Sequence, residues 1–121
     1  MKKILIVEDD EVFLQALYSL FRGEDYIIIS TNNNQEALIM TERLKPNIVL
    51  LDLLPSKNNS FDYLQNMKLN AEIKNIPVIV LFNLEDKVNI EKAKKLGAED
   101  YFIKSSANLP LLFDKVKEKT R

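Results

Sequence analysis

ILIVEDD, residues 4–10, is a run of four aliphatic residues that ends on three acids. The run does not alternate apolar and polar residues, which is typical of a strand covered on both faces in a parallel sheet. NIVLLD at residues 47–52 and YFIK at residues 101–104 follow the same plan and end on Asp52 and Lys104. The carboxyl ends of parallel strands lie at one edge of a sheet, so we expect Glu8, Asp9, Asp52 and Lys104 to meet in one crevice.

Five apolar runs of this kind alternate with segments of helical spacing. The predicted strands are Ile4–Val7, Tyr26–Ile29, Ile48–Leu51, Val78–Phe82 and Tyr101–Ile103. After each of them, apolar residues recur every three or four positions, as on one face of a helix. These predicted helices hold Phe13, Leu17 and Leu20; Ala37, Thr41 and Leu44; Phe61, Leu64 and Met67; residues 85–96; and Leu109, Leu112, Phe113 and Val116. The alternation predicts one α/β domain of (βα)5 form with an open, doubly wound sheet, because a closed barrel needs about eight units.

Both glycines of the chain, Gly23 and Gly97, follow predicted helices and are interpreted as helix terminators. Ser60 and Asn108 are predicted helix caps, and Pro110 fits the first turn of the last helix. The phosphate-binding loops of nucleotide-binding folds need glycines that let backbone amides approach the ligand. A nucleotide or flavin carrier is therefore the least supported class.

Composition excludes several kinds of chemistry. The chain of 121 residues has 17 basic and 18 acidic residues, which gives no electrostatic case for nucleic acid or an anionic membrane as the main partner. It has no cysteine and no histidine, so thiol chemistry, serine–histidine hydrolysis and a phosphohistidine of its own are excluded. No apolar run approaches the ~20 residues of a membrane span, and the acids at 8–10 interrupt any signal peptide. We expect a cytoplasmic protein.

The acids at the strand ends can be interpreted in two ways. Individually, Glu8, Asp9 and Asp10 suit the start of a helix, where one caps it and the others interact favourably with its dipole. With Asp52 at the same edge, however, the carboxylates raise each other's pKa unless a cation neutralises them. Mg²⁺ suits an open carboxylate crevice, and Lys104 adds a second positive charge. A carboxylate nucleophile, a metal and a lysine together favour formation of an aspartyl phosphate.

Over its full length the chain strongly resembles response-regulator receiver domains of two-component signalling. The segments ILIVEDD, PNIVLLDLLP, IPVIVL and LGAEDYFIK carry this resemblance by their order and spacing. It implies a flavodoxin-like strand order 2-1-3-4-5, Asp52 as phosphoacceptor, and Lys104 as a contact of the phosphoryl group. It also implies Mg²⁺ held by Asp9, by Asp52, by Glu8 through water, and by the backbone carbonyl of Leu54.

Partners and organisation follow from the same resemblance. The expected donor is a sensor histidine kinase or phosphotransfer protein, and the output is an unknown downstream protein. We expect residues 1–121 to form a stand-alone receiver without an output domain, monomeric or weakly dimeric. Such a protein is not an enzyme, apart from catalysing its own phosphorylation and dephosphorylation.

The chain departs from the family pattern at several positions. Phe82 stands where receivers have a serine or threonine that binds the phosphoryl group, and its ring either adds to the core or partly covers the site. Tyr101 matches the switch aromatic of the family. Pro55 comes one residue early, and Ser105 replaces the proline after Lys104, so we expect a trans peptide there.

Two further positions, Leu54 and Leu84, normally influence the attack of water on the aspartyl phosphate. Both are apolar here, which predicts slow dephosphorylation. The replacement at Phe82 keeps a second interpretation open, that of a degenerate receiver-like binding module that signals without phosphorylation.

Overall fold

Five parallel strands form one sheet in the order β2-β1-β3-β4-β5. The structure is a computed structural model that describes residues 1–53 and 60–121. The strands are β1 (Lys2–Val7), β2 (Tyr26–Thr31), β3 (Ile48–Asp52), β4 (Val78–Phe82) and β5 (Asp100–Ile103). The predicted α/β class and strand order are confirmed, and each predicted strand is found within two residues of its expected bounds.

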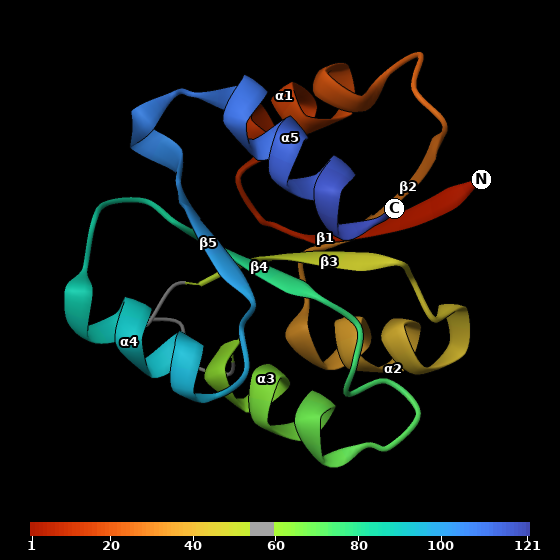
Figure 1. Cartoon of the computed structure of the whole chain (residues 1–121), viewed down its shortest axis with the longest axis vertical. Helices are drawn as coiled ribbons and strands as arrows, with labels where there is room; N and C mark the ends of the chain where they lie inside the picture. The colour runs from red at the N-terminus through yellow and green to blue at the C-terminus, as the bar shows by residue number, and fades with distance from the viewer. Residues whose placement is uncertain (54–59) are drawn as a thin grey trace.

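Helices cover both faces of the sheet. They are α1 (Glu11–Phe21), α2 (Asn34–Leu44), α3 (Ser60–Leu69), α4 (Lys87–Lys95) and α5 (Leu109–Lys119), with a 3-10 turn at Lys104–Ser106. Figure 1 shows α1 and α5 on one face and α2, α3 and α4 on the other. The fourth helix begins at Lys87, later than the expected residue 85, because the Asp86 side chain caps it by accepting from the Asn89 N–H. Within the described residues, no helix combines the length and apolar character of a membrane span.

Side-chain caps explain where the helices begin. The Asp10 carboxylate accepts the N–H groups of Val12 and Phe13 at 3.0 and 3.3 Å and caps α1. Asn108 caps α5 as predicted, by accepting from the Leu111 N–H at 3.2 Å. The predicted cap Ser60 begins α3, but its side chain lies outside the described part of the chain. Among the three acids after β1, Asp10 is thus the capping residue, which leaves Glu8 and Asp9 for another role.

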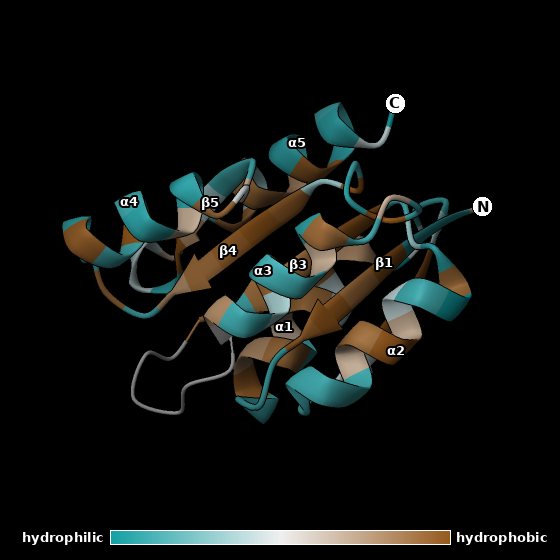
Figure 2. Ribbon diagram, turned by 90° about the horizontal axis from the view of Figure 1, so that it is seen from below, coloured by the Kyte–Doolittle hydropathy of each residue, from teal (hydrophilic) through white to brown (hydrophobic). Residues whose placement is uncertain are grey.

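The strands are apolar on both faces because each face is covered. Figure 2 shows hydrophobic strands, in brown, between helices in which hydrophobic and hydrophilic residues alternate. Leu5, Leu51 and Val80 belong to the buried cluster under α2, α3 and α4. Ile4, Leu50 and Leu81 belong to the cluster under α1 and α5. The three central strands β1, β3 and β4 are almost entirely apolar where they are buried, and the buried acids Glu8 and Asp52 lie at their carboxyl ends.

Aromatic rings pack against one another in the buried cluster under α1 and α5. The Phe21 ring lies 5.4 Å from the Tyr26 ring and 5.7 Å from the Phe113 ring, measured between centroids. The Tyr26 hydroxyl also lies 2.9 Å from the Thr120 hydroxyl, within hydrogen-bonding distance. These contacts join the first helix and second strand to the last helix.

Candidate functional site

Three acids and one lysine converge at the carboxyl ends of the strands. Glu8 and Asp9 follow β1, and Asp52 ends β3, whose residues pair in parallel with those of β1. One carboxylate oxygen from each of these acids lies within 4.8 Å of the others. Glu8 and Asp52 are buried, whereas Asp9 is exposed. The structure therefore brings together the acids that the strand-end pattern predicted.

Lys104, which follows β5, bridges two of these acids. Its Nζ donates to both Glu8 oxygens at 3.0 and 3.2 Å and to Asp52 Oδ1 at 3.2 Å. The same ammonium lies 4.9 Å above the centroid of the Phe13 ring on α1. The peptide after Lys104 is trans, as predicted from Ser105. The lysine is thus held in the crevice by two carboxylates and one aromatic face.

Burial and like charge make Asp52 an unusual carboxylate. Burial raises the pKa of Asp52 to about 7, the charge of Glu8 adds to this rise, and the Lys104 ammonium opposes it. Burial also lowers the pKa of Lys104, but Glu8 and Asp52 outweigh that effect and leave its pKa raised. Among the described residues, one ammonium, that of Lys104, thus contacts two members of a group of three acids.

This donor set fits a hard divalent cation. Mg²⁺ prefers oxygen ligands and usually takes a few carboxylates while it keeps several waters. Glu8, Asp9 and Asp52 offer such oxygens, and the exposure of Asp9 leaves one side of the group open to water. The fourth predicted ligand, the carbonyl of Leu54, lies outside the described residues.

A hollow of about 330 Å³ lies beside the crevice. Its lining residues are Asp10, Val12, Phe13, Ala16, Asn83, Lys104 and Ser105. Phe13 and Asn83 were not singled out from the sequence, because Phe13 fits the helical core pattern and Asn83 is a single polar residue in a loop. The Lys104 side chain therefore borders both the acidic crevice and an opening that a partner can approach.

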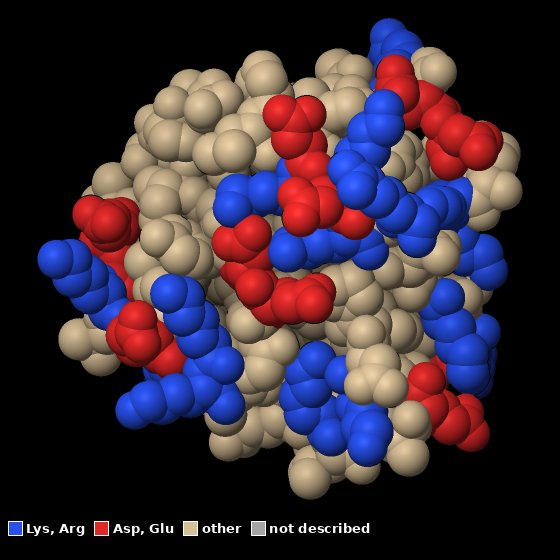
Figure 3. Space-filling view, viewed as in Figure 1, with Lys and Arg blue, Asp and Glu red and all other residues tan. Residues whose placement is uncertain are grey.

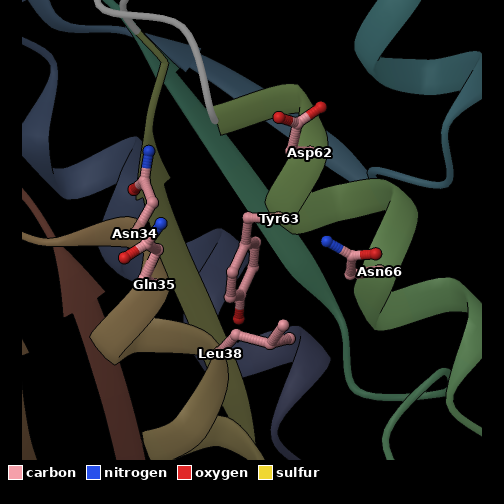
Figure 4. Close-up of a pocket in the computed structure, with 6 residues that line it drawn as sticks. All are labelled: Asn34, Gln35, Leu38, Asp62, Tyr63 and Asn66. Carbon is pink, nitrogen blue, oxygen red and sulfur yellow. The ribbon is translucent and has the colours of Figure 1, made fainter.

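A second hollow, of about 140 Å³, lies between α2 and α3. Figure 4 shows its lining residues Asn34, Gln35, Leu38, Asp62, Tyr63 and Asn66. Its only charged lining residue in the described part of the chain is Asp62, and the Tyr63 hydroxyl lies 2.8 Å from that of Thr41. This hollow lacks the convergent charges of the strand-end crevice.

The family model for the response regulator receiver domain matches residues 4–117. The chain belongs to the response regulator receiver domains. Receivers are signalling proteins of two-component systems rather than enzymes in the usual sense. The predicted family is confirmed.

Two solved receivers share the fold at comparable identity. The Mn²⁺-bound response regulator Rcp1 has a TM-score of 0.80 and 27% identity, with 98% of this chain and 91% of that chain covered. The phosphorylated cyanobacterial phytochrome response regulator RcpA has a TM-score of 0.78 and 28% identity, with 97% and 89% covered.

Curated relatives are of two lengths. A probable transcriptional regulator, ycf27 of Porphyridium aerugineum, is 30% identical over 85% of this chain, which spans only 42% of that relative. The polar-differentiation response regulator DivK of Brucella anthropi is 27% identical over 96% of this chain and 94% of its own length. The absence of an output domain therefore stays a prediction.

Phe82, which the resemblance places at the position of a serine or threonine, is buried in the structure. The side chain is only 3% exposed and belongs to the buried cluster under α2, α3 and α4. Its ring meets the Tyr101 ring edge to face, with centroids 6.5 Å apart, and the Lys94 ammonium lies 5.3 Å from the centroid of Tyr101. Of the two placements left open by the sequence, the structure has the ring packed in the core. Leu84, two residues later, is 70% exposed.

Proposed function

We propose that this receiver accepts a phosphoryl group on Asp52 from a phosphohistidine of a sensor kinase or phosphotransfer protein. The observation that carries the proposal is the bridge from Lys104 to Asp52 and Glu8 inside a group of three acids. An ordinary structural ion pair needs only one acid, whereas this arrangement surrounds one carboxylate with both the negative and the positive groups that phosphoryl transfer uses.

In the proposed reaction, a carboxylate oxygen of Asp52 attacks the phosphorus of the donor. A P–O bond to Asp52 forms as the P–N bond to the donor imidazole breaks, and the electron pair of that bond returns to the ring nitrogen. In this proposal the donor ring approaches over the hollow lined by Phe13, Asn83 and Lys104, which shares Lys104 with the crevice. Because the nucleophile must be ionised, the reaction requires Asp52 to lose its proton.

The neighbouring residues have separate roles in the proposal. Asp9 and Asp52 would hold Mg²⁺ directly and Glu8 through water, and the carbonyl of Leu54, which lies outside the described residues, would be a further ligand. The bound ion supplies positive charge that favours the ionised carboxylate and offsets the charge of the phosphoryl oxygens. Lys104 turns its ammonium from Asp52 toward a phosphoryl oxygen, which its flexible stem permits.

Output in this proposal passes through protein contacts in the cytoplasm. Phosphorylation adds about 1.5 to 2 negative charges at the crevice. This added charge changes the electrostatic interactions of Lys104 and of the neighbouring loops. Acidic and basic side chains are interspersed on the face seen in Figure 3, which gives no large basic field for nucleic acid. A downstream protein is therefore the proposed partner.

The direct test is phosphorylation in solution. The protein is incubated with Mg²⁺ and acetyl phosphate and then weighed intact, beside Asp52→Asn and an Asp62→Asn control. We expect the native chain and the control to gain one phosphoryl mass and Asp52→Asn to gain none. A gain that persists in Asp52→Asn would rule out Asp52 as the acceptor.

Phe82 supports a second candidate function. A phenyl ring cannot donate the hydrogen bond that a hydroxyl would give to the phosphoryl group, so one contact worth about 1.5–3 kcal/mol is missing. The alternative is a receiver-like module that binds its partner without phosphorylation. Failure of the native chain to gain mass from acetyl phosphate or from a kinase would favour this alternative.

A further inference from the structure

The two edge strands of the sheet differ in how their open sides are protected. Exposed edges invite pairing with another strand, and proteins usually guard them with charges, prolines or bulges. At β5, Asp100 is paired with Lys115 at 2.8 Å and Lys119 at 3.7 Å, and Lys94 lies over Tyr101. In Figure 3, acidic and basic side chains meet in the region where Figure 1 places β5 and α5. This edge is thus guarded by charge.

At the opposite edge, β2, the described residues form no comparable ion pair. Its sequence, YIIIST at residues 26–31, contains no charged residue and no proline. In the described residues, β2 pairs only with β1, and Ile27 is 43% exposed. Three consecutive isoleucines without a charge have the composition of segments that pair with other strands. The edge is therefore both open and apolar.

The residues of β2 whose backbone N–H and C=O groups point away from β1 can be identified from the hydrogen bonds between the two strands. The carbonyls of Asp25 and Thr31 accept from β1 and the residue after it, at 3.3 Å from Lys2 N and 3.0 Å from Glu8 N. Because the backbone groups of a strand alternate in direction, residues 25, 27, 29 and 31 face β1. The N–H and C=O groups of Tyr26, Ile28 and Ser30 consequently face away from the sheet.

We propose that this edge pairs with the same edge of a second copy, antiparallel and with a two-fold axis at Ile28. Outward residues must lie opposite outward residues, and a register centred on Ile28 places Tyr26 opposite Ser30 of the second copy. Tyr26 exchanges two hydrogen bonds with Ser30 of the second copy, and Ile28 exchanges two with Ile28 of the second copy, as in any antiparallel ladder. The register also sets Ile27 opposite Ile29 of the second copy, a β-branched pair that favours strand association.

Charge at the ends of the strand agrees with this register. The acids before β2, Glu24 and Asp25, fall opposite Asn32 and Thr31 of the second copy, so no like charges meet. The side chains of Tyr26 and Ser30 are held at the α1 and α5 face by Thr120 and Tyr18, at 2.9 and 3.0 Å, away from the open edge. The two sheets then form one continuous sheet, and the proposed phosphoryl site stays outside the contact.

The first test is the mass of the full chain by sedimentation from about 10 µM to about 1 mM. We expect a reversible dimer, which Ile27→Lys weakens by at least about tenfold because it places a charge on the edge. Ile39→Lys, on the exposed side of α2, is the control, since Ile39 is 51% exposed but lies outside β2. A chain that stays monomeric at about 1 mM would overturn the proposal.

A second test locates the contact. The chain has no cysteine, so Ile28→Cys carries a single thiol on the proposed axis. Opposed residues in such a pair have Cα atoms about 5.5 Å apart, within the range of a disulfide. Mild oxidation is expected to cross-link Ile28→Cys and not Ile39→Cys. Equal cross-linking of the two variants would count against the β2 edge.

Amide exchange provides a readout without substitution. The amides of Tyr26, Ile28 and Ser30 are expected to gain protection as the protein concentration rises, whereas those of Ile27 and Ile29 already bond to β1 and stay unchanged. A dimer in which these outward amides show no gain uses another surface. Protection of the same amides only by an unrelated extended peptide would replace the second copy with a different partner and refute the proposal.

Discussion

Replacing Asp52 with asparagine is expected to stabilise the metal-free protein at neutral and alkaline pH. Burial and Glu8 raise the pKa of Asp52 from 3.8 to about 7. Each pKa unit corresponds to about 1.4 kcal/mol, so ionising Asp52 costs about 4 kcal/mol more in the folded protein than in the unfolded chain. Asparagine has nearly the same shape and stays neutral at every pH.

The direction of this pKa change determines how the stability of the native chain varies with pH. Because the folded-state pKa is raised, the protonated carboxyl contributes stability that is complete below about pH 3.8 and lost as pH rises through about 7. About 3 kcal/mol of that loss falls between about pH 5 and about pH 8. The free energy of unfolding of Asp52→Asn should therefore rise relative to the native chain by about 2–3 kcal/mol across this interval.

Urea unfolding with a chelator, followed at several pH values, measures this difference. Asp114→Asn, which changes an exposed carboxylate on α5, is the control and should show a difference that varies by less than about 0.5 kcal/mol with pH. Added Mg²⁺ should stabilise the native chain at about pH 8 and Asp52→Asn much less, because a ligand stabilises only the form that binds it. A difference between Asp52→Asn and native that does not change with pH would refute the reasoning, since Lys104 would then balance the carboxylates fully.

The remaining predictions concern the residues around Asp52. Lys104→Met should lower the free energy of unfolding by about 3 kcal/mol at pH 8, because it removes the ammonium that bridges the buried carboxylates of Glu8 and Asp52, and Mg²⁺ should restore part of this loss. Phe82→Thr should cost about 3 kcal/mol of stability for the lost ring, yet increase phosphorylation by acetyl phosphate about tenfold over the equally small Phe82→Val. Equal phosphorylation of the two would show that the hydroxyl has no role. Leu84→Asn should leave stability within about 0.5 kcal/mol and shorten the phosphoryl lifetime measured by mass, whereas Val88→Asn should not. Loss of the phosphoryl group within seconds in the native chain would contradict the expected slow dephosphorylation.

Most of the fold could be predicted from local patterns in the sequence. The strands were recognisable because burial on both faces removes the polar alternation, as in Ile48–Leu51 and Val78–Phe82. The first residue of a helix was harder to predict where a capping side chain determines it. The fourth helix was expected near residue 85, but both Glu85 and Asp86 are possible caps, and only the bond from Asn89 N–H to Asp86 distinguishes them.

The site could be predicted in outline but not in detail. Strand-end acids and the rule for parallel sheets were enough to bring Glu8, Asp9 and Asp52 together. The sequence could not indicate that the Phe13 ring lies beneath Lys104, because its spacing equals that of an ordinary core residue. Likewise, whether Phe82 packs inward or over the crevice depends on how β4 is rotated relative to α4, which no single position encodes.

The contacts of Phe21 and Tyr26 with Phe113 and Thr120 have a consequence for the order of folding. They join parts of the chain separated by more than eighty residues, so the first helix and second strand cannot complete their packing until α5 docks. Contacts between distant parts of a chain form slowly, because the loop between them must close first. Until α5 docks, the β1–α1–β2 unit therefore stays incompletely covered, with Leu17 and Phe21 exposed to solvent.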